Sequence, residues 1–138
     1  MTASSTEAYV LLDTSVLIDA EKLDLSEYVS CAFVVSAVTI GELAFGVDTG
    51  TDPDAREARL RRVLSGYEIV PFGLEEAKFY GVLATLVRAA GRNPRPRRLD
   101  LQIAATAAVG RIPLLTTNPV DFRGLDRLVD VVPVGPIS

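Results

Sequence analysis

Four acidic residues stand where solubility alone does not call for a charge. Asp13 ends the apolar run YVLL, Glu42 lies inside the apolar stretch TIGELAF, Asp100 follows an arginine-rich segment, and Asp121 follows LLTTNPV. Two carboxylates about 4 Å apart repel by roughly 4 kcal/mol at an effective dielectric near ~20, so three or four together need a divalent cation. Such a cluster with one or two magnesium ions can activate water and stabilise a phosphodiester transition state. If the four acids meet, we expect metal-dependent phosphodiester hydrolysis.

Each acid also has a purely structural interpretation. Asp13 could cap a helix that begins after it. Glu42 could pair with one of the arginines, because a buried unpaired carboxylate is costly. Asp100 could be a favourable acid in the first turn of a helix, and Asp121 could form a turn beside Pro119. For each acid taken alone, the structural interpretation competes well with a metal site. For the four acids taken together it weakens, because all four occupy positions that a parallel sheet would bring near one edge.

The chain contains no histidine. Nucleophile pairs of the Ser-His or Cys-His kind are therefore excluded, and so are zinc sites built on His and Cys. The side chains that remain for catalysis or metal binding are carboxylates, hydroxyls, two lysines and the arginines. Oxygen ligands of this kind suit hard cations such as Mg²⁺ or Mn²⁺.

Hydroxyl side chains stand next to two of the acidic positions. Thr14 and Ser15 follow Asp13 directly, and Thr116 and Thr117 end the apolar run that precedes Asp121. We expect them to orient carboxylates or metal ligands, with helix capping as the alternative. Of the residues near the first acid, Ser15 is the expected helix cap.

These positions follow from an alternation of strands and helices along the whole chain. Apolar runs predict strands, and 3.6-residue periodicity with capping residues predicts helices. The expected strands are 8–12, 31–35, 67–72, 112–117 and 130–134, and the expected helices are 15–22, 37–47, 51–66, 74–91 and 99–110. This order predicts an α/β fold around a mostly parallel sheet, in which residues after the first and fourth strands reach the same edge.

A basic segment, RNPRPRR, precedes Asp100. Although the net charge is −4, a local positive patch of this kind can grip phosphates. The candidate phosphate-binding residues are Arg97 and Arg98, followed by Arg95 and Arg92, on a loop that its prolines keep out of the helix. The alternative is a solvated loop without a ligand. No aromatic platform for bases is evident beside it.

The ordered motifs LLDTSVLID, SAVTIGELAFGV, LDLQIAATA and LLTTNPVDF resemble those of PIN domains, and in particular of the VapC-type toxins of bacterial toxin–antitoxin pairs. The resemblance runs from about Tyr9 to Val134. It implies a three-layer α/β/α PIN domain with a mostly parallel central sheet of four to five strands. Some relatives carry Asp where this chain has Asn118, which leaves open whether Asn118 or Asp121 completes the metal site.

The resemblance also implies an activity, a cofactor and partners. It implies an endoribonuclease that cuts single-stranded RNA with Mg²⁺, or with Mn²⁺, held by Asp13, Glu42, Asp100 and Asp121, and that leaves a 5′-phosphate and a 3′-hydroxyl. It implies a VapB-type antitoxin as the partner and a homodimer within a larger complex. The apolar helix 37–47 fits a surface that is buried against such a partner.

The expected organisation is a flexible tail over 1–8 and a single domain over 9–138, in a cytoplasmic protein without a signal peptide or membrane span. Two rival interpretations remain. A receiver-like signalling domain would need a second acid beside Asp13 and a late strand-end lysine, yet the lysines are Lys22 and Lys78. A degenerate PIN fold would act as a binding module that takes up no metal.

Overall fold

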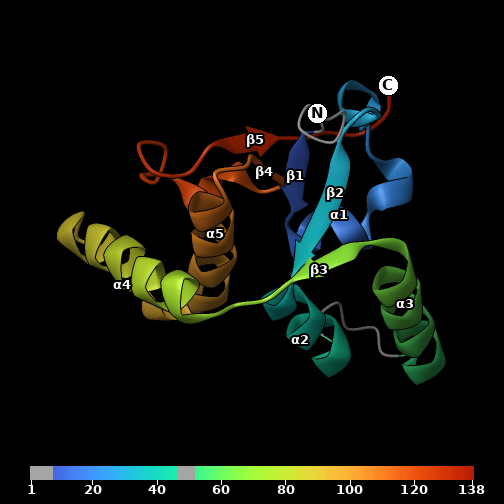
Figure 1. Cartoon of the computed structure of the whole chain (residues 1–138), viewed down its shortest axis with the longest axis horizontal. Coiled ribbons are helices and arrows are strands. Elements are labelled where there is room, and N and C mark those ends of the chain that lie inside the picture. The colour runs from blue at the N-terminus through green and yellow to red at the C-terminus, as the bar shows by residue number, and fades with distance from the viewer. Residues whose placement is uncertain (1–7, 47–51) are drawn as a thin grey trace, which may run out of the picture.

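The apolar runs pair into one five-stranded sheet whose neighbouring strands are all parallel (Figure 1). The computed structural model describes residues 8–46 and 52–138. The order of the strands across the sheet is β3-β2-β1-β4-β5. The strands span Tyr9–Leu12 (β1), Ala32–Ser36 (β2), Glu68–Val70 (β3), Leu114–Thr116 (β4) and Val131–Pro133 (β5).

α-Helices connect β1 to β2, β2 to β3 and β3 to β4, as is usual for parallel strands, whereas a 3₁₀ turn lies between β4 and β5. The α-helices are α1 (Thr14–Ile18), α2 (Ala37–Phe45), α3 (Pro53–Gly66), α4 (Leu74–Ala89) and α5 (Arg98–Gly110). Short 3₁₀ turns are η2 (Ala20–Lys22), η3 (Ser26–Tyr28), η4 (Arg95–Arg97) and η5 (Pro119–Phe122). No helix within the described ranges is both long enough and apolar enough to cross a membrane.

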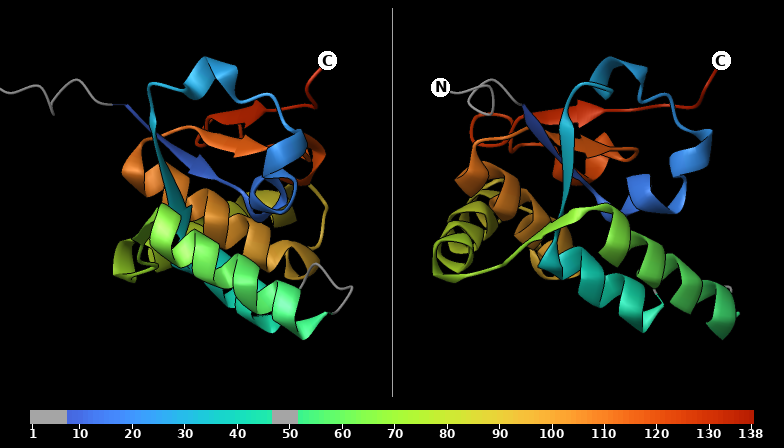
Figure 2. Two further views of the ribbon diagram at one scale, coloured as in Figure 1. Left: turned by 90° about the vertical axis from the view of Figure 1, so that its right-hand side faces the viewer. Right: turned by 45° about the vertical axis from the view of Figure 1, so that its right-hand side comes forward.

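Both faces of the sheet are buried, which explains why its central strands are continuous apolar runs. Leu11 of β1 packs toward α4 and α5, while its neighbours Val10 and Leu12 pack toward α1 and α3. The views agree, with α4 and α5 on one side of the sheet and α1 and α3 on the other, and with α2 beside α3 (Figures 1 and 2). The three-layer α/β/α expectation is confirmed.

Capping residues and glycines predicted most helix boundaries correctly. The Ser36 hydroxyl accepts a hydrogen bond from the Val38 amide at 3.0 Å, which caps α2. Gly46 ends α2 with φ at +89°, a left-handed conformation that favours glycine. The predicted helix 37–47 extends one residue into 47–51, and the predicted tail 1–8 lies mostly in 1–7; both segments are outside the described residues.

Two local predictions need correction. The segment 92–98 is not a loop throughout, because it contains the turn η4, and α5 begins already at Arg98. The first helix begins at Thr14 with Asp13 as its cap, so Ser15 is not the capping residue. Asp13 is the cap because it stands immediately before the helix in extended conformation, where its carboxylate reaches the Thr14 amide.

Candidate active site at the carboxyl edge of the sheet

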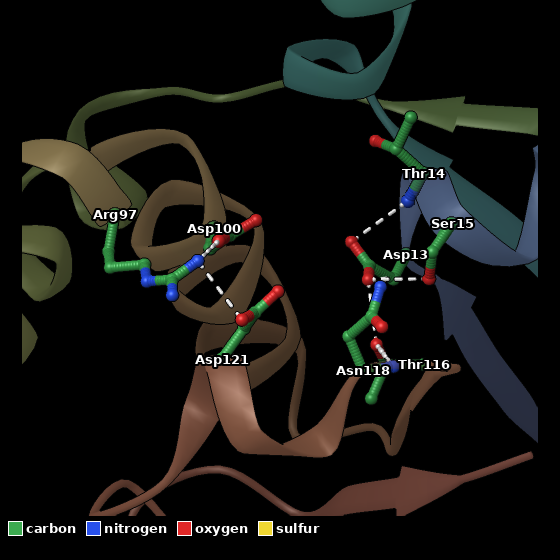
Figure 3. Close-up of polar contacts among 8 residues, drawn as sticks. All are labelled: Asp13, Thr14, Ser15, Arg97, Asp100, Thr116, Asn118 and Asp121. Atoms are coloured by element: carbon green, nitrogen blue, oxygen red, sulfur yellow. Dashed lines mark hydrogen bonds and ion pairs between the residues drawn. The ribbon is translucent and has the colours of Figure 1, made fainter. Parts of the chain in front are cut away.

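Asp13 lies at the carboxyl end of β1, and its side chain is held by three donors (Figure 3). The Thr14 amide donates to Oδ1 at 2.9 Å. The hydroxyls of Ser15 and Thr116 donate to Oδ2 at 2.9 and 2.7 Å. The residue is only 5% exposed. Asp13 therefore caps α1 with one oxygen, while hydroxyls from two strand ends hold its other oxygen.

The Thr116 contact depends on the order of the strands. β1 and β4 are neighbours, and Leu12 is in register with Leu115, which brings the next residues of both strands together. The Ser15 hydroxyl also accepts from the Thr117 amide at 3.2 Å, so it links the two strand ends. Burial raises the pKa of Asp13, the hydrogen bonds from Thr116, Ser15 and Thr14 oppose this rise, and the charge of Asp121 adds to it.

Glu42 reaches the same region from α2. The Thr14 hydroxyl donates to its Oε1 at 2.6 Å. Burial raises the pKa of Glu42, the Thr14 hydrogen bond lowers it, and the charge of Asp13 raises it further. No arginine of the described residues lowers the pKa of Glu42, whose partner is a hydroxyl, so the ion-pair interpretation was wrong.

Thr39 is a site residue that sequence reasoning missed. It is fully buried, and its hydroxyl lies 3.0 Å from that of Thr14. Thr39 precedes Glu42 by three residues on α2, a spacing that places both on one face of a helix. That spacing was the available signal.

Asp100 and Asp121 form the other half of the site and share Arg97 between them (Figure 3). Arg97 Nη1 lies 3.0 Å from Asp121 Oδ1 and 3.7 Å from Asp100 Oδ2. Burial raises the pKa of Asp100 to about 7, helped by the charges of Asp13, Asp121 and Glu42 and opposed by Arg97. All four predicted acids thus belong to one electrostatic cluster centred on Asp100.

Asn118 enters the cluster through its backbone. Its amide donates to the Thr116 hydroxyl at 3.0 Å, and that hydroxyl in turn donates to Asp13. Asp121 carries a charge that raises the pKa of Asp13 and Asp100. In this arrangement Asp121 provides the late carboxylate, and Asn118 supports Thr116.

The cluster has the donor chemistry of a divalent cation site. Its ligands are all carboxylate oxygens, which Mg²⁺ and Mn²⁺ prefer. The carboxylates of Asp100 and Asp121 point toward Asp13 (Figure 3). As the side chains stand, no group of three or more acidic or Cys residues within 8–46 and 52–138 is arranged to hold an ion. Burial and the charges of Asp13, Asp121 and Glu42 raise the pKa of Asp100 although Arg97 opposes them, so the carboxylates disfavour one another's ionisation as they stand.

The four arginines of the basic segment separate into different environments. Arg97 contacts the acids. Arg92 Nη2 donates to the Arg123 carbonyl at 2.8 Å, which ties this arginine to the backbone after η5. Arg95 and Arg98 instead line a separate hollow against α4. Of the four, the structure brings only Arg97 into contact with the acids.

The receiver-like interpretation finds no support in this geometry. Such a site needs a lysine beside the acids, whereas Lys78 pairs with Glu75 on the exposed side of α4 and Lys22 lies in η2. The acids are instead accompanied by hydroxyls and by Arg97.

Comparisons with known proteins agree with the geometry. The PIN domain family matches residues 10–128. The chain is 36% identical over 112 residues to "Ribonuclease VapC4" of Mycobacterium tuberculosis, a match covering 78% of this chain and 85% of that protein. It is 29% identical over 130 residues to "Ribonuclease VapC" of Rickettsia bellii, covering 86% and 92%. It is also similar to a solved chain of VapBC-5, a toxin–antitoxin system of Mycobacterium tuberculosis, with TM-score 0.68 and 32% identity, covering 91% of this chain and 96% of that chain.

Proposed function

Because the chain belongs to the PIN-domain family and resembles its VapC ribonucleases, we propose that it is an endoribonuclease and the toxin of a toxin–antitoxin pair. One observation carries the proposal beyond the family. Carboxylates from three separate segments of the chain act on Asp100 together, and its neighbour Asp13 is fixed by three donors. Gathering this much negative charge costs free energy unless a cation offsets it.

We propose Mg²⁺, with Mn²⁺ as a substitute, as the cofactor held by Asp13, Glu42, Asp100 and Asp121. The bound cation supplies charge stabilisation for the phosphodiester transition state and makes water a better nucleophile. The chain supplies orientation: Thr116 and Ser15 fix one oxygen of Asp13, and Thr14 fixes Glu42. Without such hydroxyls, carboxylates would lose the geometry that ligands need.

Arg97 is suited to contact a phosphate of the RNA beside the acids. Its guanidinium stands at the acids but is about half exposed, so a substrate can reach it. An arginine makes charge-assisted hydrogen bonds to phosphate oxygens. Binding of RNA there would exchange the carboxylate contacts of Arg97 for phosphate contacts.

We further propose a VapB-type antitoxin as the partner and a homodimer within the complex. The support from the structure is the apolar surface of α2, where Phe45 is 86% exposed. The other exposed residues of this helix, Ala37, Gly41 and Ala44, are also uncharged, and a contiguous apolar patch is typical of a surface that a partner covers. A single domain over 9–138 and a cytoplasmic location, where RNA is available, complete the proposal.

The test is cleavage of single-stranded RNA by the purified chain. We expect cleavage with Mg²⁺, none with a chelator and none for Asp13→Asn, because Asn keeps the size of the side chain but loses its charge. Thermal unfolding of the variant checks that the fold is intact. Cleavage by a folded Asp13→Asn variant at the rate of the unmodified chain would refute the assignment of the site.

A further inference from the structure

A basic hollow lies one residue along the chain from Arg97, which contacts the acids. A hollow of about 320 Å³ opens between α4 and the segment that leads into α5. Its lining residues are Tyr80, Arg88, Asn93, Pro94, Arg95 and Arg98. Three guanidinium groups therefore surround one small space, and no acidic residue lines it.

The positive charge of this hollow is uncompensated. No carboxylate of the described chain pairs with Arg88, Arg95 or Arg98. The guanidinium contact there is a long one, from Arg98 Nη1 to the Arg95 carbonyl at 3.4 Å. Although the net charge of the chain is −4, the positive charges of these three arginines repel one another unless an anion binds between them.

Tyr80 gives the hollow a wall and a further donor. The residue is half-buried and packs against the core below α4, which fixes its position. Its hydroxyl has no hydrogen-bond partner in the part of the chain that the structure describes. Arginine guanidinium groups and a free phenol together are suited to phosphate oxygens.

The hollow is continuous in sequence with the candidate active site. Arg97 contacts Asp100 and Asp121, while Arg95 and Arg98 on either side of it line the hollow. The same turn thus presents one arginine to the acids and two to the hollow. Because Arg98 follows Arg97 directly, the hollow begins one residue away from the arginine at the acids.

We propose that this hollow binds a phosphate of the RNA strand flanking the scissile one, with Arg88, Arg95 and Arg98 as ligands and the Tyr80 hydroxyl as a donor. The inference rests on the proposed ribonuclease function. It adds Tyr80 and Arg88, which lie on α4 and outside the basic segment, to the RNA-binding residues. It also assigns Arg97 a different phosphate from that of its neighbours.

The experiment measures binding of a fluorescent single-stranded RNA by anisotropy, with a chelator present to stop cleavage, at several salt concentrations. We expect Arg88→Gln and Arg98→Gln each to weaken binding about three- to tenfold, and the slope of log K against log salt to fall by about 0.7 for each phosphate that the variant no longer neutralises. Tyr80→Phe, which keeps the ring, should weaken binding about two- to tenfold. Arg62→Gln, an exposed arginine on α3 at the other side of the molecule, is the matched control and should change neither value.

The outcomes separate this proposal from the proposed function. If the chain cleaves RNA but Arg88→Gln and Arg98→Gln bind RNA with the affinity and salt slope of Arg62→Gln, the phosphate site is wrong and the nuclease stands. If the unmodified chain does not cleave RNA at all, the nuclease is wrong. If inorganic phosphate binds the chain but neither variant alters RNA binding, the hollow is an anion site outside the RNA path, and the proposal is again refuted.

Discussion

Replacing Asp100 with Asn should remove the pH dependence of stability that this residue creates in the metal-free chain. The pKa of Asp100 is raised from 3.8 to about 7 in the folded chain. The folded state therefore holds this proton more tightly than the unfolded state, so stability falls as pH rises from about 4 to about 7 and is constant above that. Each pH unit in this interval corresponds to about 1.4 kcal/mol.

Between pH 5 and pH 8 the free energy of unfolding should thus fall by up to about 3 kcal/mol because of Asp100 alone. The value is an upper one, since a quarter of the side chain is exposed to water. Asn has the same size and no charge, so Asp100→Asn should not show this decrease. Mg²⁺ or Mn²⁺ should restore the stability of the unmodified chain at pH 8, because a ligand that binds only the folded state stabilises it.

Urea unfolding of chelator-treated protein at pH 5, 6, 7 and 8 measures the effect. The matched control is Asp126→Asn, which makes the same change at an exposed position outside the site. We expect the curve of Asp126→Asn to follow the unmodified chain and that of Asp100→Asn to be flatter. Parallel curves for all three proteins would refute the conclusion that burial and the neighbouring acids raise the pKa of Asp100.

Two further changes test how the site is held. Thr116→Val removes the 2.7 Å hydrogen bond to Asp13. It should lower stability by about 1–3 kcal/mol and weaken Mn²⁺ binding about tenfold or more. The control Thr117→Val removes no side-chain hydrogen bond and should change neither stability nor Mn²⁺ binding. Equal affinities of the two variants in a Mn²⁺ titration would contradict the role of Thr116. Arg97→Gln should tighten Mn²⁺ binding about two- to fivefold in calorimetry, because the guanidinium no longer pairs with the carboxylates of Asp100 and Asp121. Weaker Mn²⁺ binding by this variant would show that Arg97 supports the cation instead.

The backbone placement of the acids followed from the sequence. Continuous apolar runs predict buried parallel strands, and the carboxyl ends of neighbouring strands share an edge. Asp13 and the residues after β4 therefore come together as predicted. Glu42 was singled out because an acid in an apolar helix needs a partner, although that partner is the Thr14 hydroxyl and not an arginine.

Side-chain directions and the packing of distant elements could not be derived in this way. The direction of each arginine side chain depends on the turn η4. The prolines of this segment predicted a loop and not a turn, so the different environments of Arg97 and Arg98 were not predicted. Tyr80 reaches the basic segment only because α4 packs against α5. Both features depend on tertiary packing, which no local pattern in the chain specifies.

The most direct test of the central claim is a calorimetric titration of Mn²⁺ into the purified chain and into its Asp13→Asn variant at pH 7.5. A site formed by the four carboxylates predicts saturable uptake by the unmodified chain and its loss in the folded variant. No uptake by the unmodified chain would identify a degenerate PIN fold that acts only as a binding module. Equal uptake by both proteins would contradict the assignment of Asp13 as a ligand.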